Sequence, residues 1–295
     1  GPWVQRRRGT PTRDGRALRT RRVGHTGTLD PCATGLLILC ADRATRLASL
    51  FHLLPKRYEA EIVLGSETDT DDRTGEPVLS SEAWRRLARA DAERALLGLT
   101  GELLQAPPAF SAKKVAGRRA HRIARLGGDP GLAPAPVRVH GLTLVEWAPP
   151  RVRIDAWVST GTYVRALARD LGRELGCGAH LGALRRTAIG PFKVEEALSA
   201  ASIPESRDLR ETEAWFTPLH ALDWLPLRAL DPEEVQAVSH GAAVTAGEVA
   251  SPRRPGFPVG PEPSLPVALA DGDGLVAVAE RRGATLQPRT VIRAA

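Results

Sequence analysis

Val23-Gly24-His25-Thr26-Gly27-Thr28-Leu29-Asp30-Pro31 is a polar stretch punctuated by glycines, and such a composition predicts a loop. It leads into the mainly apolar run at residues 35–41, whose length and continuity predict a short strand buried on both faces. Asp42 can N-cap a helix after this strand, with apolar positions at Leu47, Leu50, Phe51 and Leu54. We therefore expect a rigid, glycine-bounded loop to hold Asp30 beside a buried strand.

Periodic patterns farther along the chain predict both strands and helices. Residues 58–64 and 152–158 alternate between apolar and other side chains, which is typical of half-buried strands. A helix over residues 81–97 would turn Trp84, Leu87, Ala88 and Leu96 inward. A second helix is expected after Tyr163, ending at Gly176, and a short basic one over residues 118–126. These patterns indicate an α+β domain.

The two ends of the chain differ in composition from the part between them. Residues 1–22 are rich in Arg, Gly, Thr and Pro, so we expect an irregular basic arm there. We expect a main domain at residues 23–222 and a small all-β domain at residues 225–295, where residues 267–279 predict a β-hairpin. Because the chain begins with Gly and contains no Met, we expect its translational start to be missing or removed.

The charge of the chain favours a polyanionic partner. Its 295 residues carry 41 Lys and Arg against 34 Asp and Glu, which gives a formal net charge of +7. Such a protein attracts nucleic acids because binding releases their counterions. Since only four of the basic residues are Lys, the arginine excess can equally reflect genomic base composition. The hydrophobic content of 42% is enough for a sizeable core and excludes a disordered chain.

Several other classes of protein are disfavoured by the sequence. Cys32, Cys40 and Cys177 are an odd number without a C-x-x-C pair, which argues against a disulfide framework and fits a reducing cytoplasm. No apolar run has the length of a membrane span or the character of a signal peptide. The acidic stretch at residues 68–75 lacks the Gly and Glu of a calcium-binding EF-hand loop, so we expect a turn closed by its side chains.

The segment that begins at Gly24 and five later segments of the chain correspond to the motifs of one enzyme family and occur in the same order. Residues 24–35 read G-H-T-G-T-L-D-P-C-A-T-G, and the other matching segments are Lys56-Arg57-Tyr58, residues 68–75, residues 105–112, Gly161-Thr162-Tyr163-Val164-Arg165, and Gly178-Ala179-His180 through Leu184-Arg185-Arg186. Over about residues 21–192 the chain resembles the TruB family of tRNA pseudouridine synthases. The family's first motif, K-P-x-G-x-[ST]-S, is not found in residues 1–22.

The resemblance implies a fold and a reaction. The fold would be a mixed, mainly antiparallel sheet flanked by helices, followed by a small PUA-like RNA-binding β-domain at the C-terminus. The reaction would convert uridine to pseudouridine at position 55, in the T-loop of tRNA. It breaks a C–N glycosidic bond, turns the base and joins its C5 to the sugar, so it demands neither a metal nor an organic cofactor. It needs one carboxylate beside a base that has left its stack.

Three residues are expected to carry the chemistry. By resemblance, Asp30 is the essential carboxylate and Arg165 the cation that orients it and favours its charged form. An arginine in the first turn of a helix is disfavoured by the helix dipole, so Arg165 needs another reason to be there. Tyr58 would stack on the target base and take a proton from C5 late in the reaction. Whether Asp30 attacks C6 of the base, attacks C1′ of the sugar or removes a sugar proton stays open.

Other residues are expected to bind the RNA. The resemblance implies that Tyr163 and Leu184 line the nucleotide pocket together with Tyr58, and that His25 fills the space left by the flipped nucleotide. Candidate contacts to the RNA backbone form a basic run of Lys113, Lys114, Arg118, Arg119 and Arg122, although each could equally belong to a solvated helix face. We expect the T-stem-loop of tRNA as the partner of a cytoplasmic monomer that needs no membrane and no protein partner.

Three alternative functions are weighed against this interpretation. The first is a guide-RNA-directed relative, which the form of the motif at residues 25–28 and the absence of long basic extensions disfavour. The second is a non-catalytic tRNA-binding or tRNA-folding factor, suggested by the missing first motif. A pure binder has no need of Asp30, Tyr58 and Arg165 together. The third, a generic metabolic enzyme, has no phosphate loop or metal constellation to support it.

Overall fold

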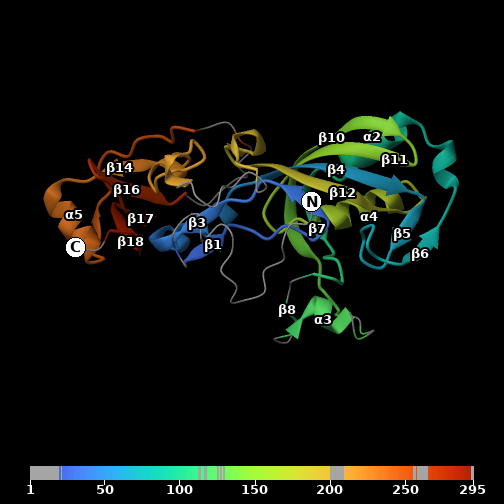
Figure 1. The fold of residues 1–295 in the computed structure, drawn as a ribbon, viewed down its shortest axis with the longest axis horizontal. Coiled ribbons are helices and arrows are strands. Elements are labelled where there is room, and N and C mark those ends of the chain that lie inside the picture. The colour runs from blue at the N-terminus through green and yellow to red at the C-terminus, as the bar shows by residue number, and fades with distance from the viewer. Residues whose placement is uncertain are drawn as a thin grey trace. The chain divides into compact units, whose positions relative to one another are not determined.

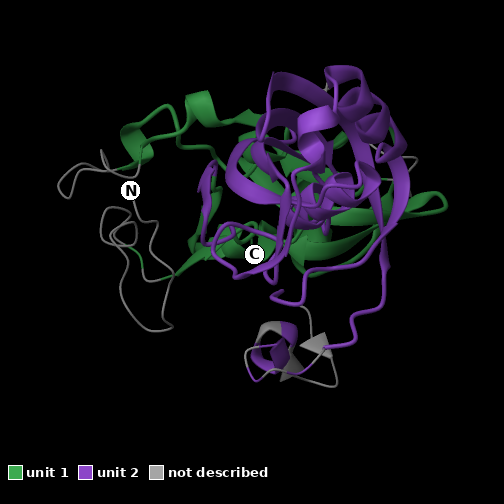
Figure 2. Ribbon diagram, turned by 90° about the vertical axis from the view of Figure 1, so that its right-hand side faces the viewer, with its two compact units in different colours: residues 1–28, 37–52, 191–295 green, residues 29–36, 53–190 purple. Residues whose placement is uncertain are grey.

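The computed structural model describes residues 20, 22–111, 114–115, 118–124, 126, 128, 130–199, 209–254, 257 and 265–293, and of residues 114–115, 118–119 and 121 the backbone. The chain divides into two compact units (Figure 2). Unit 1 comprises residues 1–28, 37–52 and 191–295, and unit 2 comprises residues 29–36 and 53–190. The expected N-terminal arm, apart from Thr20 and Arg22, lies outside the described residues. The expected domain boundaries stay predictions.

Unit 2 is built on a central sheet with the strand order β12-β4-β11-β10-β7 (Figure 1). Its strands are β4 (Lys56–Leu64), β7 (Gly101–Gln105), β10 (Ala135–Ala148), β11 (Arg151–Val158) and β12 (Ala179–Ile189). These neighbours pair antiparallel, whereas the short β2 (Ala33–Gly35) pairs parallel with β12. The expectation of a mixed, mainly antiparallel sheet is therefore confirmed.

The alternation in β4 and β11 sets which side chains enter the core. Ala60, Ile62 and Leu64 of β4 are buried, and so are Val152, Ile154, Ala156 and Val158 of β11. Since neighbouring side chains of a strand point to opposite faces, the charged positions between them remain more accessible. Both predicted strands are confirmed, and their apolar positions belong to the main core of unit 2.

Two helices pack on this sheet, α4 (Val164–Glu174) against β12 and α2 (Arg89–Gly98) against β10 (Figure 1). Helix α4 has the predicted bounds, and Gly176 after it adopts a φ of 67°, which suits glycine at a helix C-terminus. The helix expected over residues 81–97 is in fact two elements, η3 (Ala83–Arg86) and α2. Leu87 and Ala88 between them are extended, and Ala88 is exposed rather than inward-facing.

Smaller elements complete unit 2. They are β5 (Ser66–Thr68) paired with β6 (Pro77–Ser80), β8 (Lys114–Val115) paired with β9 (Arg118–Arg119), and the short helix α3 (Ala120–Ala124). The basic helix expected over residues 118–126 is therefore shorter than predicted. Among the described residues, no helix is long and apolar enough to cross a membrane.

The segment after Asp30 differs from its predicted form. The apolar run at residues 35–41 is not one buried strand, because β2 ends at Gly35, where φ is 101°, and β3 (Leu39–Ala41) begins four residues later. In unit 1, β3 pairs with β1 (Val23–His25) in a two-stranded sheet. The helix expected after Asp42 consists of two 3₁₀ segments, η1 (Asp42–Leu47) and η2 (Leu50–His52). Asp42 is not their N-cap, since it has a φ of 50° and Ala41 occupies the cap position.

The C-terminal part of unit 1 contains a five-stranded sheet in the order β14-β16-β17-β18-β15. Its strands are β14 (Leu227–Ala229), β15 (Val244–Thr245), β16 (Val267–Asp271), β17 (Gly274–Arg282) and β18 (Thr285–Val291). The predicted hairpin is confirmed as β16 and β17. This part is not all-β, because α5 (Pro232–Ser239), capped by Asp231, packs on the sheet. Unit 1 also holds β13 (Phe192–Lys193), η4 (Val194–Glu196), η6 (Leu209–Glu211) and η7 (His220–Leu222).

Candidate active site

The Asp30 turn is anchored to strand β12 on its C-terminal side. The Ala33 amide donates to the Asp30 carbonyl (2.9 Å), which closes the turn, and β2 then pairs with β12. At Gly35 a Cβ atom would lie 2.2 Å from the carbonyl oxygen of Arg186, so only glycine allows this approach. The Leu36 amide donates to the same carbonyl (2.8 Å). The turn that presents Asp30 is therefore held by close backbone contact with the sheet.

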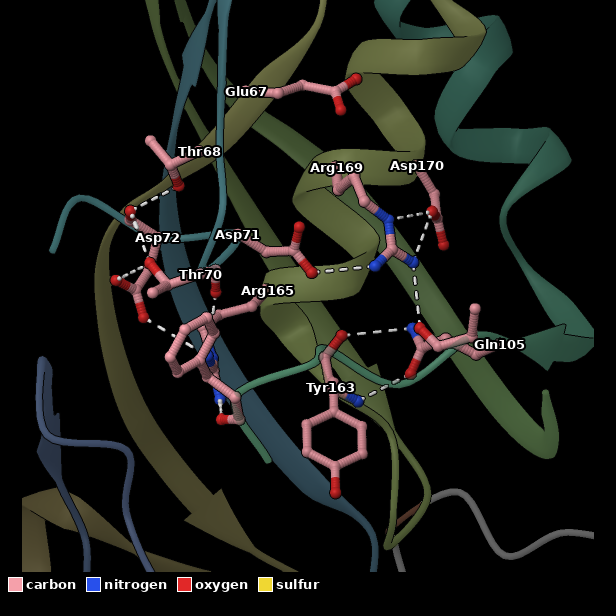
Figure 3. A network of polar contacts seen from close by, with 12 residues as sticks. Glu67, Thr68, Thr70, Asp71, Asp72, Gln105, Tyr163, Arg165, Arg169 and Asp170 are labelled. Atoms are coloured by element: carbon pink, nitrogen blue, oxygen red, sulfur yellow. Dashed lines mark hydrogen bonds and ion pairs between the residues drawn. The ribbon is translucent and has the colours of Figure 1, made fainter. Parts of the chain in front are cut away.

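Arg165 places its guanidinium against the Asp30 carboxylate. Its Nε lies 3.0 Å from Asp30 Oδ2, and its other nitrogens donate to the carbonyls of Thr70 (2.9 Å) and Phe110 (3.2 Å). Asp72 Oδ2 lies 3.5 Å from the guanidinium (Figure 3). Arg165 is only 5% exposed, so the alternative of a solvated arginine at the helix start is excluded. Two carboxylates and two carbonyls offset the unfavourable interaction of this cation with the helix dipole.

Asp72 belongs to the turn at residues 68–75, which its own side chains close. Asp72 Oδ1 accepts hydrogen bonds from the Thr70 hydroxyl (3.0 Å) and from the Thr74 amide (2.9 Å) and hydroxyl (2.5 Å). The Thr68 hydroxyl donates to the Asp72 carbonyl (2.7 Å). This confirms the predicted side-chain-bonded turn. In the part of the chain that the structure describes, no group of His, Cys, Asp and Glu side chains could hold a metal ion.

A second arginine repeats this arrangement one helical turn later. Arg169 donates to Asp71 Oδ2 (2.8 Å), to the Ala106 carbonyl (3.0 Å) and to Asp170 Oδ1 (2.9 Å) (Figure 3). Burial raises the pKa of Asp71, and the charge of Arg169 opposes that rise. Residues four apart lie on one face of a helix. Arg165 and Arg169 therefore bind the turn at residues 68–75 and the loop after β7 from the same face of α4.

Tyr163 precedes α4 and is held by the side-chain amide of Gln105. Gln105 Oε1 accepts from the Tyr163 amide (2.8 Å), and Gln105 Nε2 donates to the Tyr163 carbonyl (3.2 Å) (Figure 3). The Tyr163 side chain is half-buried, and burial raises the pKa of its phenol, a rise that the neighbouring Ser111 opposes. The backbone of Tyr163 is thus fixed independently of its ring, which can serve as a pocket wall.

Tyr58 lies in β4 opposite Arg186 of β12 and Ala156 of β11. Its ring is half-buried against the core of unit 2. Burial raises the pKa of the Tyr58 phenol, the charge of Arg186 opposes the rise, and the charge of Asp30 adds to it.

The structure brings some of the predicted site residues together and leaves others apart. Leu184 is buried in β12, opposite Ala33. Exposed His25 lies in β1 of unit 1, so its place relative to Asp30 stays a prediction. Of the basic run, Arg122 is exposed in α3, whereas Lys113 lies outside the described residues; Lys114, Arg118 and Arg119 contribute their backbone to β8 and β9.

Three side chains of the site were not singled out from the sequence. Asp72 contacts Arg165, Gln105 fixes Tyr163, and Arg186 lies opposite Tyr58 in the sheet. All three fall inside the motifs quoted above, and membership of those motifs is the sequence feature that could have identified them. Asp72 was interpreted only as part of a turn. The partners of Gln105 and Arg186 lie 58 or more positions away in sequence and could not be inferred from spacing.

Comparison with known proteins shows which family the sequence of this chain matches. Residues 15–164 match the family described as "TruB family pseudouridylate synthase (N terminal domain)", and residues 165–220 match "tRNA pseudouridylate synthase B C-terminal domain". The chain is 39% identical over 267 residues to tRNA pseudouridine synthase B of Arthrobacter sp. (strain FB24), covering 86% of this chain and 85% of the relative. It is 41% identical over 285 residues to the protein of that name from Thermobifida fusca (strain YX), covering 92% and 89%.

Solved structures share the fold at lower sequence identity. The archaeal box H/ACA sRNP Nop10-Cbf5 complex contains a chain that superposes with a TM-score of 0.67 at 22% identity, over 96% of this chain and 80% of that one. A Cbf5-Nop10-Gar1 complex gives a TM-score of 0.70 at 23% identity, over 95% and 79%. These likenesses establish the fold, while the family match and the identities near 40% establish the family. The chain therefore belongs to the TruB family of tRNA pseudouridine synthases.

Proposed function

We propose that the chain converts uridine to pseudouridine at position 55, in the T-loop of tRNA. The observation that carries this proposal is the Asp30 carboxylate, which is one-third exposed and held by a buried arginine. The chain's relatives are named tRNA pseudouridine synthase B, which supports tRNA as the substrate. The position within the tRNA rests on the motif resemblance.

The geometry suits the demands of the reaction. The target uridine must leave its stack before an enzyme can reach it. Asp30 then acts as the nucleophile or base, while Arg165 fixes the direction of its carboxylate. Tyr58 would stack on the uracil and accept the C5 proton, and Tyr163 and Leu184 would line the pocket. His25 would take the place of the flipped nucleotide.

Recognition of the tRNA is assigned to shape and backbone contacts. Lys113, Lys114, Arg118, Arg119 and Arg122 would bind phosphates of the T-stem-loop. Residues 225–295 would act as a PUA-like RNA-binding domain. The chain is proposed to act as a cytoplasmic monomer without a protein partner, and neither a metal nor an organic cofactor enters the proposed chemistry.

The test is tritium release from a tRNA transcript that carries [5-³H]uridine. The parent chain should release tritium, and Asp30→Asn, which removes the negative charge and little else, should release none. Asp155→Asn is the matched control, because Asp155 pairs with Arg57 and lies outside the proposed site; it should keep the parental rate. If the parent binds tRNA without releasing tritium, the chain is a tRNA-binding or tRNA-folding factor and the proposal is wrong. Release by Asp30→Asn at the parental rate would remove Asp30 from the mechanism.

A further inference from the structure

Asp71 adopts a left-handed backbone conformation in the turn that binds Arg165. Its φ is 61°, a value that is uncommon for residues other than glycine and that is often found at functional sites. With this conformation, acceptors from both neighbouring residues meet one nitrogen of Arg165. Its Nη1 lies 2.9 Å from the Thr70 carbonyl oxygen and 3.5 Å from Asp72 Oδ2 (Figure 3). The direction of the Arg165 guanidinium therefore depends on the conformation of Asp71.

A buried ion pair holds the Asp71 side chain. Asp71 Oδ2 lies 2.8 Å from Arg169 Nη1, and the two residues are 9% and 7% exposed. A hydrogen bond between charged groups is roughly twice as strong as one between neutral groups. Backbone contacts with β12 hold the same turn, since the Leu181 amide donates to the Asp71 carbonyl (3.0 Å) and the Arg73 amide donates to the Leu181 carbonyl (2.9 Å). The left-handed residue is thus held through both its side chain and its backbone.

Arg169 also reaches the second loop that binds Arg165. Its Nη2 donates to the Ala106 carbonyl (3.0 Å), and the same loop supplies the Phe110 carbonyl, which accepts from Arg165 Nη2 (3.2 Å). Arg169 Nε donates to Asp170 Oδ1 (2.9 Å), so each nitrogen of this guanidinium has an acceptor within the protein. Because Arg169 is buried and its nitrogens are engaged in this way, it acts on its neighbours rather than on a substrate.

We propose that Arg169 and Asp71 are positioning residues that set the direction of the Arg165 guanidinium. The inference rests on the proposed function. Two routes from the pair converge on Arg165, one through the turn that contains Asp71 and one through the loop after β7. Since Arg165 Nε lies 3.0 Å from Asp30 Oδ2, a displaced guanidinium would also displace the carboxylate that must meet the uridine. Such a misplacement lowers the rate of the chemical step and leaves binding of the RNA largely unchanged.

Single-turnover kinetics test whether the pair acts through Arg165. Arg169→Gln should lower the rate of tritium release about 10- to 100-fold, with less than about a twofold change in the Kd for the transcript. In an Arg165→Met background the same substitution should cost less than about twofold, because the group that it positions is gone. Equal losses in the two backgrounds, or a loss of binding as large as the loss of rate, would overturn the proposal. Arg173→Gln, one turn farther along α4 at an exposed position, is the matched control and should keep the parental rate.

Asp71→Asn tests the pair from its other side and is compatible with the conformation of the turn. Asparagine also adopts the left-handed region, and its side-chain oxygen can accept from Arg169 without a negative charge. The rate of tritium release should fall about 3- to 10-fold, because a neutral hydrogen bond replaces a charged one. In the Arg165→Met background the loss should again be less than about twofold. A folded Asp71→Asn variant with the parental rate would contradict the proposal.

Hydrogen–deuterium exchange tests the contact without using the reaction. Arg169→Gln should speed exchange of the amides in the turn at residues 68–75 by about 10-fold or more, while the amides of β4 and β11 keep their parental rates. Arg173→Gln should change neither. Unchanged exchange in the turn, or equal acceleration in β4 and β11, would show that the pair does not hold this turn specifically and would refute the proposal. If the parent chain forms no pseudouridine, the proposed function fails, whereas the exchange still decides whether Arg169 holds the turn.

Discussion

Arg165 connects several segments of the candidate active site through one side chain. Its guanidinium joins Asp30, Asp72 and the carbonyls of Thr70 and Phe110, which come from three different segments of unit 2. Removing it would leave two carboxylates close together without a cation between them. Asp30 would then lose the contact that fixes its orientation and would face the repulsion of a second carboxylate.

Replacing Arg165 by Met should therefore abolish most of the activity. We expect the single-turnover rate to fall by at least about 100-fold, the size of loss seen when one preorganised electrostatic contact is removed. Arg173→Met is the control on the same helix, since Arg173 is 60% exposed and pairs with Glu67 outside the site. Tritium release and the melting temperature should be measured for both variants. A folded Arg165→Met variant with near-parental rates would contradict this account.

Lys56 should make stability depend on pH in a defined direction. Burial and the charge of Arg186 lower the pKa of Lys56 to about 8 from a usual value of 10.5. Below pH 8 Lys56 is charged in both the folded and the unfolded chain, so burial of its charge lowers the free energy of unfolding by the full amount. Between about 8 and 10.5 the unfolded chain binds the extra proton, so the contribution of Lys56 to the free energy of unfolding rises with pH. The whole rise is roughly 3 kcal/mol.

The measurement is urea unfolding of the parent and of Lys56→Met between pH 7.5 and 10. The free energy of unfolding of the parent minus that of the variant should increase across this range, because Met cannot titrate. Other groups, including Tyr58, titrate in both proteins and cancel in the difference to first order. A difference that stays flat with pH would show that Lys56 has an ordinary pKa in the folded protein.

The sequence predicted part of this residue-scale picture. Arg165 could be assigned a buried partner because a cation at a helix N-terminus needs a compensating reason, and the structure supplies Asp30. Arg186 could not be found in this way. Its neighbour Leu36 directly follows β2 and its neighbour Tyr58 lies in β4, and the pairing of β12 with β2 and β4 brings them together.

At the scale of elements, clear periodicity was a better guide than apolar composition. The alternating strands β4 and β11 and the helix α4 were predicted closely, because a regular pattern fixes which face is buried. The apolar run at residues 35–41 carries no such pattern, and the left-handed conformation of Gly35 interrupts it. Extended backbone at Leu87 and Ala88 likewise splits the helix predicted over residues 81–97, because tertiary packing overrides helix propensity there.

Two helical glycines should respond oppositely to the same substitution. In α4, a Cβ on Gly172 would lie 2.1 Å from the Ala179 amide nitrogen of β12, so Gly172→Ala must push the helix off the sheet. We expect a loss of about 3 kcal/mol in the free energy of unfolding. In α2, nothing lies within 4 Å of the corresponding position on Gly98, so Gly98→Ala should gain about 0.5 kcal/mol. Chemical denaturation of both variants tests this, and equal effects would contradict the described packing of α4 on β12.

At the scale of the whole molecule, the net charge of +7 should govern tRNA affinity. If the five residues of the basic run each neutralise a phosphate, the logarithm of affinity should fall against the logarithm of salt with a slope of roughly −4. Arg122→Gln should make the slope shallower by about one. Arg85→Gln is the control, because Arg85 pairs with Glu82 outside the basic run. Filter binding from 50 to 200 mM salt measures the slopes, and an affinity independent of salt would contradict the assignment.

The arrangement of Gln105 around Tyr163 limits which mutations the gene can tolerate. The side-chain amide uses its oxygen for the Tyr163 amide and its nitrogen for the Tyr163 carbonyl, so both a donor and an acceptor are required at one spot. A single base change in a glutamine codon yields Glu, Lys, His, Arg, Leu, Pro or a stop, and none of these places a donor and an acceptor side by side in the same way. Every amino-acid substitution that a single base change can produce at position 105 therefore removes the paired hydrogen bonds to Tyr163. These bonds connect the end of β7 to the start of α4, the helix that carries Arg165.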